Sequence, residues 1–309
     1  QVIGTLTVVL LANLLVFHRD SLSLSAFAEN ERGFGSAAAY LFVPVALYCL
    51  NRFLLRGGWL VLAGFLFCLP LIIFLQHRSV WIATAVALPI DLWLLRRVPG
   101  ARFSLPKVLA LVLLPAVLGS LGATALVLDN PEVVNRLATN LEDMANADKQ
   151  GTGSWRLKQM ESYVPLVQER PFAGWRLEGF EVPMQFYDPS SNQPMWQDRT
   201  GHHFHSFYLD RAFYFGIIGL VMVLLVPIIR TGQRLWQPGP MRSDTALLIA
   251  YFGCLLVFSA SYDWSTYHFG LLGLLLAYLA EPEPQPSSLI SRPAKAVARP
   301  APSHAYARL

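Results

Sequence analysis

Three histidines close the longest polar stretch of the chain, residues 129–211, immediately before an apolar segment. They are His202, His203 and His205. An imidazole with its ordinary pKa of about 6.5 could take the proton of a hydroxyl group at neutral pH, so one of them could act as a general base. Two alternatives stay open. One is a metal site, although zinc usually takes about four ligands and no cysteine or second compact His/Glu cluster is at hand; the other is three surface histidines without a role.

Several arginines could bind an anion beside these histidines. Arg78 lies at the mouth between two apolar segments, where a cation is costly unless it reaches the membrane interface or meets an anion. It is therefore either an interface anchor or a phosphate ligand. Arg156 is expected in the first turn of a helix, where the dipole favours anions, so a phosphate sharing its site is one interpretation and a solvated arginine the other. Further candidates of the same kind are Arg170, Arg176 and Arg211.

Two acidic residues lie at the ends of apolar segments. Asp263 stands in a short turn, where it could orient a base or an acceptor hydroxyl, or simply occupy a wet turn. Asp91 is expected to pair with Arg96 or with another neighbour. The chain has no Walker loop and no dinucleotide fingerprint. Arginines and a histidine at the level of lipid headgroups therefore favour a lipid-linked phosphate as substrate.

The composition is that of a polytopic membrane protein, with 54% hydrophobic and 14% charged residues, whereas a soluble domain has about 25% charged residues. The three cysteines lie in apolar runs, which predicts core or lipid-facing positions rather than disulfides. The net charge of +4 comes from bases scattered over short loops, so membrane topology explains it better than a nucleic-acid partner. Apolar sequence begins directly at Gln1, which suggests the C-terminal part of a longer membrane protein.

Eight apolar segments approach the length of about 20 residues that a spanning helix needs. They are residues 1–17, 36–51, 58–75, 80–95, 107–128, 212–229, 245–261 and 266–280. The predicted fold is an all-α polytopic membrane protein with five spans in residues 1–128, a large outer loop at 129–211, three spans in 212–280, and a disordered cytoplasmic tail at 281–309. Strict alternation places the base-rich loops on one side, which the positive-inside rule makes the cytoplasm, so the large loop faces the periplasm.

Within the large loop, Ser154 is the predicted N-cap of a helix that runs towards Arg170 and ends at Pro171 and Gly174. This helix is expected to lie against the outer membrane surface or to pack on the spans. Its predicted apolar face consists of Leu157, Met160, Val164 and Val167.

Six short motifs occur in an order that resembles the bacterial O-antigen ligase and polymerase family. They are Arg32-Gly33-Phe34, His77-Arg78-Ser79, Ser154-Trp155-Arg156, Arg170-Pro171-Phe172-Ala173-Gly174-Trp175, His205-Ser206-Phe207-Tyr208-Leu209 and Phe215-Gly216-Ile217-Ile218-Gly219. The sequence departs from the family pattern at Ser206, where an Asn is usual.

The resemblance implies a metal-independent glycosyltransferase of the bacterial inner membrane, without a cofactor, whose donor is a glycan on undecaprenyl pyrophosphate. It implies catalytic roles for His205, Arg78 and Arg156. We also expect a set of substrate-binding residues on the same outer side, namely Arg32, Arg170, Arg176, His203, Arg211 and Asp263.

The favoured function is a ligase that moves the glycan onto a hydroxyl of lipid A-core. Within the enzyme class, the alternatives are an O-antigen or exopolysaccharide polymerase and a protein O-oligosaccharyltransferase. A polysaccharide transporter or flippase would place its ionisable residues near the middle of the bilayer, where this chain has almost none. A structural membrane protein would tolerate single His or Arg changes.

Overall fold

The computed structural model describes residues 2–29, 33–101, 104, 106, 107, 109–111, 113, 131–146, 151–175 and 204–281. The regular elements in this part of the chain are all helices, which confirms the all-α class. They are α1 (Val2–Phe17), the 3-10 turn η1 (Arg19–Leu22), α2 (Leu24–Glu29), α3 (Ser36–Tyr40), α4 (Phe42–Arg56), α5 (Trp59–Phe74), α6 (Arg78–Leu95), α8 (Pro131–Ala145), α9 (Gly151–Glu169), α10 (Phe207–Trp236), α11 (Ser243–Phe258) and α12 (Thr266–Ala280).

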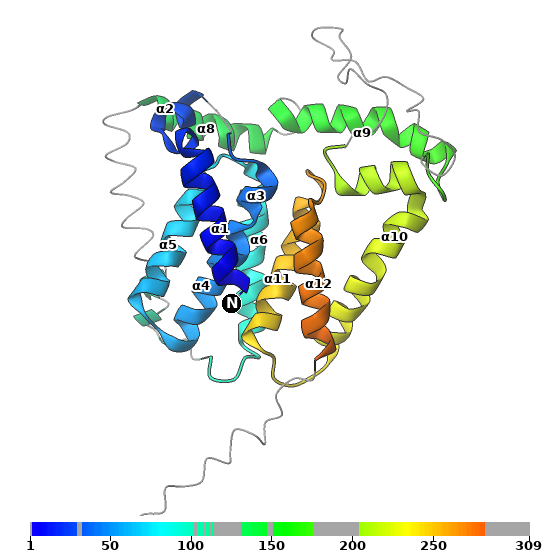
Figure 1. Cartoon of the computed structure of the whole chain (residues 1–309). Helices are drawn as coiled ribbons and strands as arrows, with labels where there is room; N and C mark the ends of the chain where they lie inside the picture. Colours follow the sequence, from blue (N-terminus) through cyan, green and yellow to red (C-terminus); the bar gives the residue numbers. More distant parts are fainter. Residues whose placement is uncertain are drawn as a thin grey trace, which may run out of the picture.

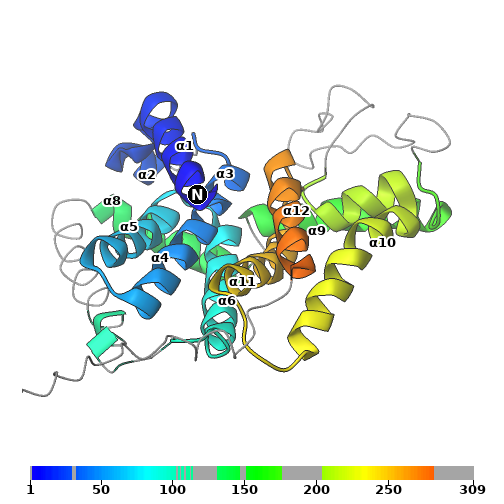
Figure 2. The same cartoon turned by 60° about the horizontal axis from the view of Figure 1, so that its bottom comes forward.

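The helices α1, α4, α5, α6, α11 and α12 stand side by side, and α8 and α9 lie across one end of them (Figure 1). Helix α11 packs against α6 and α4, so its apolar residues are buried almost all round, as expected for a central helix. Figure 2 shows α10 at the edge of this bundle, where it contacts α12. The fold thus consists of an upright apolar bundle closed at one end by two crosswise helices.

Seven of the eight predicted spans coincide with helices. Three of these helices are long and apolar enough to cross a membrane: Ser36–Arg56, which joins α3 to α4, then α6 and α10. Helices α1, α5, α11 and α12 are apolar but shorter. Most of the predicted span at 107–128 lies outside the described residues. A membrane protein is therefore supported, while the number of spans stays a prediction.

The segments predicted to share a side of the membrane do lie together. At one end, the Arg97 guanidinium donates hydrogen bonds to the carbonyls of Leu235 (3.1 Å) and Gly239 (3.3 Å), and the Met241 N–H donates to the Arg97 carbonyl (2.9 Å). At the other end, α2 contacts α8 and α8 contacts α9. This grouping agrees with the predicted alternation of loops, and which end faces the periplasm stays a prediction.

Helix α10 consists of two segments joined at Gly216, whose φ of 67° and ψ of −173° break the helix. The first segment lies crosswise beneath α9, and the second descends along the bundle (Figure 1). The N–H groups that the break leaves without helical partners are satisfied from outside. Ile217 donates to the carbonyl of Pro171 (2.7 Å) and Ile218 to that of Phe172 (3.4 Å). The turn after α9 therefore docks directly on the kink of α10.

Several local expectations were wrong in detail. Helix α9 begins at Gly151, so Ser154 is inside the helix rather than its N-cap. Three of the four residues of the predicted apolar face, Leu157, Met160 and Val164, are exposed by 43, 41 and 38%, whereas Val167 is partly buried against the cluster of Tyr163 and Leu166. Among the described side chains of α9, the buried ones are Gln159, Tyr163 and Leu166, and the last two belong to the same cluster as Phe204 and Phe213.

Several polar groups are buried in the bundle. Asp91 is fully buried and accepts a hydrogen bond from Asn51 (3.1 Å), so its partner is a spatial neighbour rather than Arg96. Cys68 and Cys254 are buried and Cys49 is partly buried, and all three are free thiols, as predicted. The predicted disordered tail, apart from Glu281, lies outside the described residues.

Candidate active site

His205 is held immediately before the first turn of α10. Ser206 is the N-cap of this helix, and its hydroxyl accepts a hydrogen bond from the Leu209 N–H (3.3 Å). Serine therefore serves well as a cap where the family pattern has Asn. The His205 backbone N–H donates to Oε1 of Gln159 (3.3 Å), a residue of α9 that is only 1% exposed. Two elements thus fix the position of the histidine.

A cluster of aromatic rings packs α9 against the first segment of α10, next to His205. Tyr163 of α9 packs edge-on against Phe204 and Phe213, with ring centroids 4.6 and 5.6 Å apart, and Phe204 and Phe213 are themselves 5.0 Å apart. These rings are buried. Aromatic pairs of this kind stabilise a protein by more than their buried area alone would predict, so α9 and the first segment of α10 are packed firmly against each other.

Arg156 and His205 are brought together at the ring of Tyr262, in the turn between α11 and α12. The Arg156 guanidinium carbon lies 4.8 Å from the centroid of the Tyr262 ring. The His205 ring meets the same tyrosine edge-on, at 6.2 Å and 82°. Within the described part of the chain, the Arg156 guanidinium donates no hydrogen bond and makes no ion pair, so its N–H groups are available to an anion. Arg156 lies in the second turn of α9, not in the expected first turn.

The surroundings of His205 lower the pKa of its imidazole below the ordinary value. The larger cause is partial desolvation by the neighbouring protein, and the smaller is the positive charge of Arg156. His205 nevertheless keeps exposed surface. A lowered pKa keeps the ring neutral at neutral pH, which is the form that can accept a proton.

Arg211 and Asp263 form an ion pair beside this cluster. One guanidinium nitrogen of Arg211 lies 3.1 and 3.2 Å from the two carboxylate oxygens of Asp263, and another lies 3.2 Å from the buried Asp210. Asp263 also accepts the backbone N–H of Trp264 (2.7 Å). The pair therefore ties the first turn of α10 to the α11–α12 turn that carries Tyr262.

Arg78 lies at the start of α6 and is paired with Asp143 of α8, with an N–O distance of 2.5 Å. Both side chains are mostly buried. The turn before Arg78 is also held by hydrogen bonds. The Gln76 side chain donates to the Phe27 carbonyl (2.9 Å), and Nε2 of His77 lies 2.6 Å from the Phe34 carbonyl oxygen. Arg78 thus joins α6 to α8, whereas Arg156 faces Tyr262.

The remaining candidates are not gathered at the cluster. Arg170 follows the far end of α9, roughly 20 Å along the helix from Arg156 by helical rise, and lies over the Trp175 ring at 4.1 Å. Arg32, Arg176, His202 and His203 lie outside the described residues. The metal alternative rests largely on His202 and His203 and therefore stays open.

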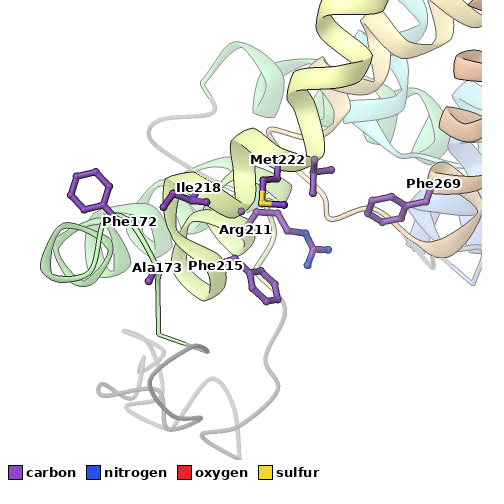
Figure 3. Close-up of a pocket in the computed structure, with 9 residues that line it drawn as sticks. Phe172, Ala173, Arg211, Phe215, Ile218, Met222 and Phe269 are labelled. Atoms are coloured by element: carbon purple, nitrogen blue, oxygen red, sulfur yellow. The ribbon is translucent and has the colours of Figure 1, made fainter.

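An apolar groove of about 580 Å³ opens on the side of α10, and Arg211 is its charged lining residue. Figure 3 shows the Arg211 side chain between Phe215 and Phe269. The groove is lined by Phe172, Ala173, Arg211, Phe215, Ile218, Gly219, Met222, Val223 and Phe269. It passes the kink of α10 and leads onto exposed apolar side chains of the second segment, among them Met222. The groove therefore joins the charged cluster to an apolar surface.

The sequence from residue 41 to residue 224 matches the protein family described as O-antigen ligase. This match covers more than half of the chain. The chain belongs to the O-antigen ligase family. A comparison with curated proteins finds no match.

Membership in the O-antigen ligase family confirms the resemblance and makes this chain a member of a family of membrane enzymes of the ligase or polymerase type. The matched range contains Arg78, Arg156 and His205 and ends within α10. Tyr262 and Asp263 lie beyond it. The sequence analysis missed Gln159 and Tyr262. The only signal for Tyr262 was its position beside Asp263, because its contacts come from segments far apart in the chain.

Proposed function

We propose that this protein transfers a glycan from undecaprenyl pyrophosphate to an acceptor hydroxyl of lipid A-core, on the periplasmic face of the bacterial inner membrane. His205 takes the proton of the acceptor hydroxyl, whose oxygen then attacks the anomeric carbon of the glycan. The bond between that carbon and the pyrophosphate oxygen breaks, and its electron pair leaves with the pyrophosphate. A single displacement inverts the configuration at the anomeric carbon.

This proposal rests on one observation. The His205 imidazole and the Arg156 guanidinium contact the same ring, that of Tyr262, and the Arg156 N–H groups have no hydrogen-bond partner among the described residues. Arg156 has free N–H donors where the leaving pyrophosphate gains charge, and such preorganised electrostatic help is usually the largest contribution to transfer reactions. The lowered pKa keeps His205 in the form that accepts a proton. We assign Arg78 a supporting role towards the pyrophosphate, in exchange for its present partner Asp143.

The groove beside Arg211 supports a lipid-linked donor. In a polyprenyl pyrophosphate the charged head is attached directly to the end of the apolar chain, so a lipid groove has to begin next to the anion site. Arg211 is one of the residues that line the groove, and its partner Asp263 adjoins Tyr262. In lipid A-core, by contrast, sugars separate the accepting hydroxyl from the acyl chains. We therefore place the polyprenyl chain of the donor, rather than the acceptor, in this groove.

The deciding experiment is deletion of the gene in its native host, followed by a gel of the lipopolysaccharide and analysis of lipid-linked glycan. A ligase defect leaves lipid A-core without polymer and accumulates polymer on its lipid carrier. A core that carries a single repeat would instead indicate a polymerase. Normal lipopolysaccharide and normal lipid-linked glycan would overturn the proposal.

An assay with purified enzyme, with and without EDTA, tests the metal-independent mechanism. We expect equal rates, because arginines rather than a divalent ion neutralise the pyrophosphate. Loss of activity in EDTA, restored by zinc or magnesium, would favour the metal alternative.

A further inference from the structure

Tyr262 is the point at which three separate parts of the chain meet. Its ring carries the guanidinium of Arg156 from α9 at 4.8 Å, and it contacts the ring of His205, which precedes α10, at 6.2 Å. Tyr262 itself belongs to the turn between α11 and α12. Arg156 and His205, the two residues to which the proposed reaction assigns the main roles, therefore both lie against the Tyr262 side chain, to which no role has yet been assigned.

A column of stacked rings holds Tyr262 in place. Its ring stacks on Phe258 at 5.0 Å, and Phe258 stacks on Tyr40 at 4.5 Å, each pair inclined by 21°. Phe258 and Tyr40 are completely buried in the bundle. The Tyr262 N–H also donates to the Phe258 carbonyl (3.1 Å). A ring at the end of a close-packed column has little freedom to move, so it offers a fixed surface to whatever lies on it.

A ring suits the placement of Arg156 better than a carboxylate would. Aromatic faces attract a guanidinium without using its hydrogen-bond donors. Arg211 and Arg78 show the contrast, since Asp263 and Asp143 occupy donors of their guanidinium groups. Arg156 is thus oriented while its N–H groups stay available to a diphosphate.

We propose that Tyr262 is the positioning residue of the transfer site. Its ring holds the Arg156 guanidinium and the His205 imidazole in the relative placement in which one meets the donor's diphosphate and the other meets the acceptor hydroxyl. The ring, not the phenolic hydroxyl, carries this role. The inference rests on the function proposed above and adds a residue that touches neither reacting atom.

The first test compares replacements of Tyr262 in purified enzyme. Tyr262→Leu should lower kcat by roughly three- to thirty-fold, the range expected for loss of one cation–π contact. Tyr262→Phe and Tyr262→Trp keep a ring and should stay within about two-fold of the parent. Tyr278→Leu is the matched control, because Tyr278 lies near the other end of α12, where its hydroxyl donates to Asp244, and its replacement is expected to leave the rate unchanged. If Tyr262→Leu does not accumulate in the membrane, Tyr262→Met, a flexible apolar replacement, takes its place.

A double-mutant cycle shows whether Tyr262 acts through Arg156. When Arg156→Ala is already present, Tyr262→Leu should cost clearly less than it costs in the parent, because residues in one network are not additive. Full additivity would overturn the proposal, and so would a Tyr262→Phe enzyme as impaired as Tyr262→Leu.

A readout without glycan transfer separates this inference from the proposed function. The rate at which diethyl pyrocarbonate modifies His205, measured against pH and corrected with His205→Ala, reports the titration of the imidazole. Among the described residues, Arg156 on α9 is the charge that acts on this imidazole, and the neighbouring elements also carry Asp210 and Arg211 on α10 and Asp263 in the turn. Tyr262→Leu should move this titration to higher pH, because Arg156 is no longer held beside the ring. An unchanged titration overturns the positioning role; a shifted titration in a protein that transfers no glycan supports it while the function proposal fails.

Discussion

Gly174 and Gly216 approach each other so closely that neither has room for a side chain. A Cβ on Gly174 would lie 2.5 Å from the backbone nitrogen of Gly216, and a Cβ on Gly216 would lie 2.1 Å from the carbonyl oxygen of Phe172. Both glycines have positive φ angles, 68° and 67°. The backbone of the turn after α9 can therefore lie directly on the kink of α10, which places α9 and Arg156 over His205.

Replacement of Gly216 by alanine should destabilise the protein. Its backbone conformation is almost restricted to glycine and the added carbon would collide with backbone, so we expect a loss of about 2 kcal/mol or more in the free energy of unfolding. The apparent melting temperature in detergent measures this. Gly232→Ala is the matched control in the same helix, because a Cβ there meets nothing within 4 Å, and it should be neutral or slightly stabilising. Equal melting temperatures for both variants would contradict the close approach.

The sequence predicted the apolar helices well, since their length and composition alone determine them. For Arg156 and His205, the sequence predicted only that both residues lie on the same side of the membrane. What could not be predicted is the contact itself, because Arg156, His205 and Tyr262 lie on three segments joined by tertiary packing. The same reason explains the misplaced face of α9. The side of α9 that is buried is the one that packs, through Tyr163, against Phe204 and Phe213, and these residues lie some 40 to 50 positions after Tyr163 in the chain.

Cysteine labelling should place the crosswise helices and the opposite loops on different sides of the membrane. Glu161→Cys on α9 should react with a membrane-impermeant maleimide in intact spheroplasts, because α9 is expected in the periplasm. Gln237→Cys, between α10 and α11, should react only after permeabilisation, since the base-rich end is expected in the cytoplasm. Both side chains are exposed, so access is not a concern. The reverse pattern would overturn the topology and the proposed periplasmic site.

Replacing Asp143 distinguishes two roles of Arg78. If Arg78 binds pyrophosphate, Asp143→Asn should keep transfer and leave the donor KM unchanged or lower, because a competing carboxylate is removed. Arg78→Lys should then lose rate despite its charge, as a planar guanidinium grips a phosphate through two parallel hydrogen bonds and an ammonium does not. If Arg78 only joins α6 to α8, both variants should lower the melting temperature alike and transfer glycan at the parent rate.

The pH dependence of transfer should report His205 directly. Because desolvation and then Arg156 lower its pKa, kcat/KM should be constant at neutral pH and fall on acidification through a midpoint below about 6.5. His205→Ala should lose roughly 10²- to 10⁴-fold in rate and lose this acid limb. Arg156→Gln removes a positive charge, so the pKa rises and the limb moves to higher pH, while desolvation still keeps it below the ordinary value. Arg156→Lys is the control: it should also lose rate, yet keep the limb near its original position because the charge is retained. A limb that stays in place in Arg156→Gln, or survives in His205→Ala, would assign the titrating base to another group.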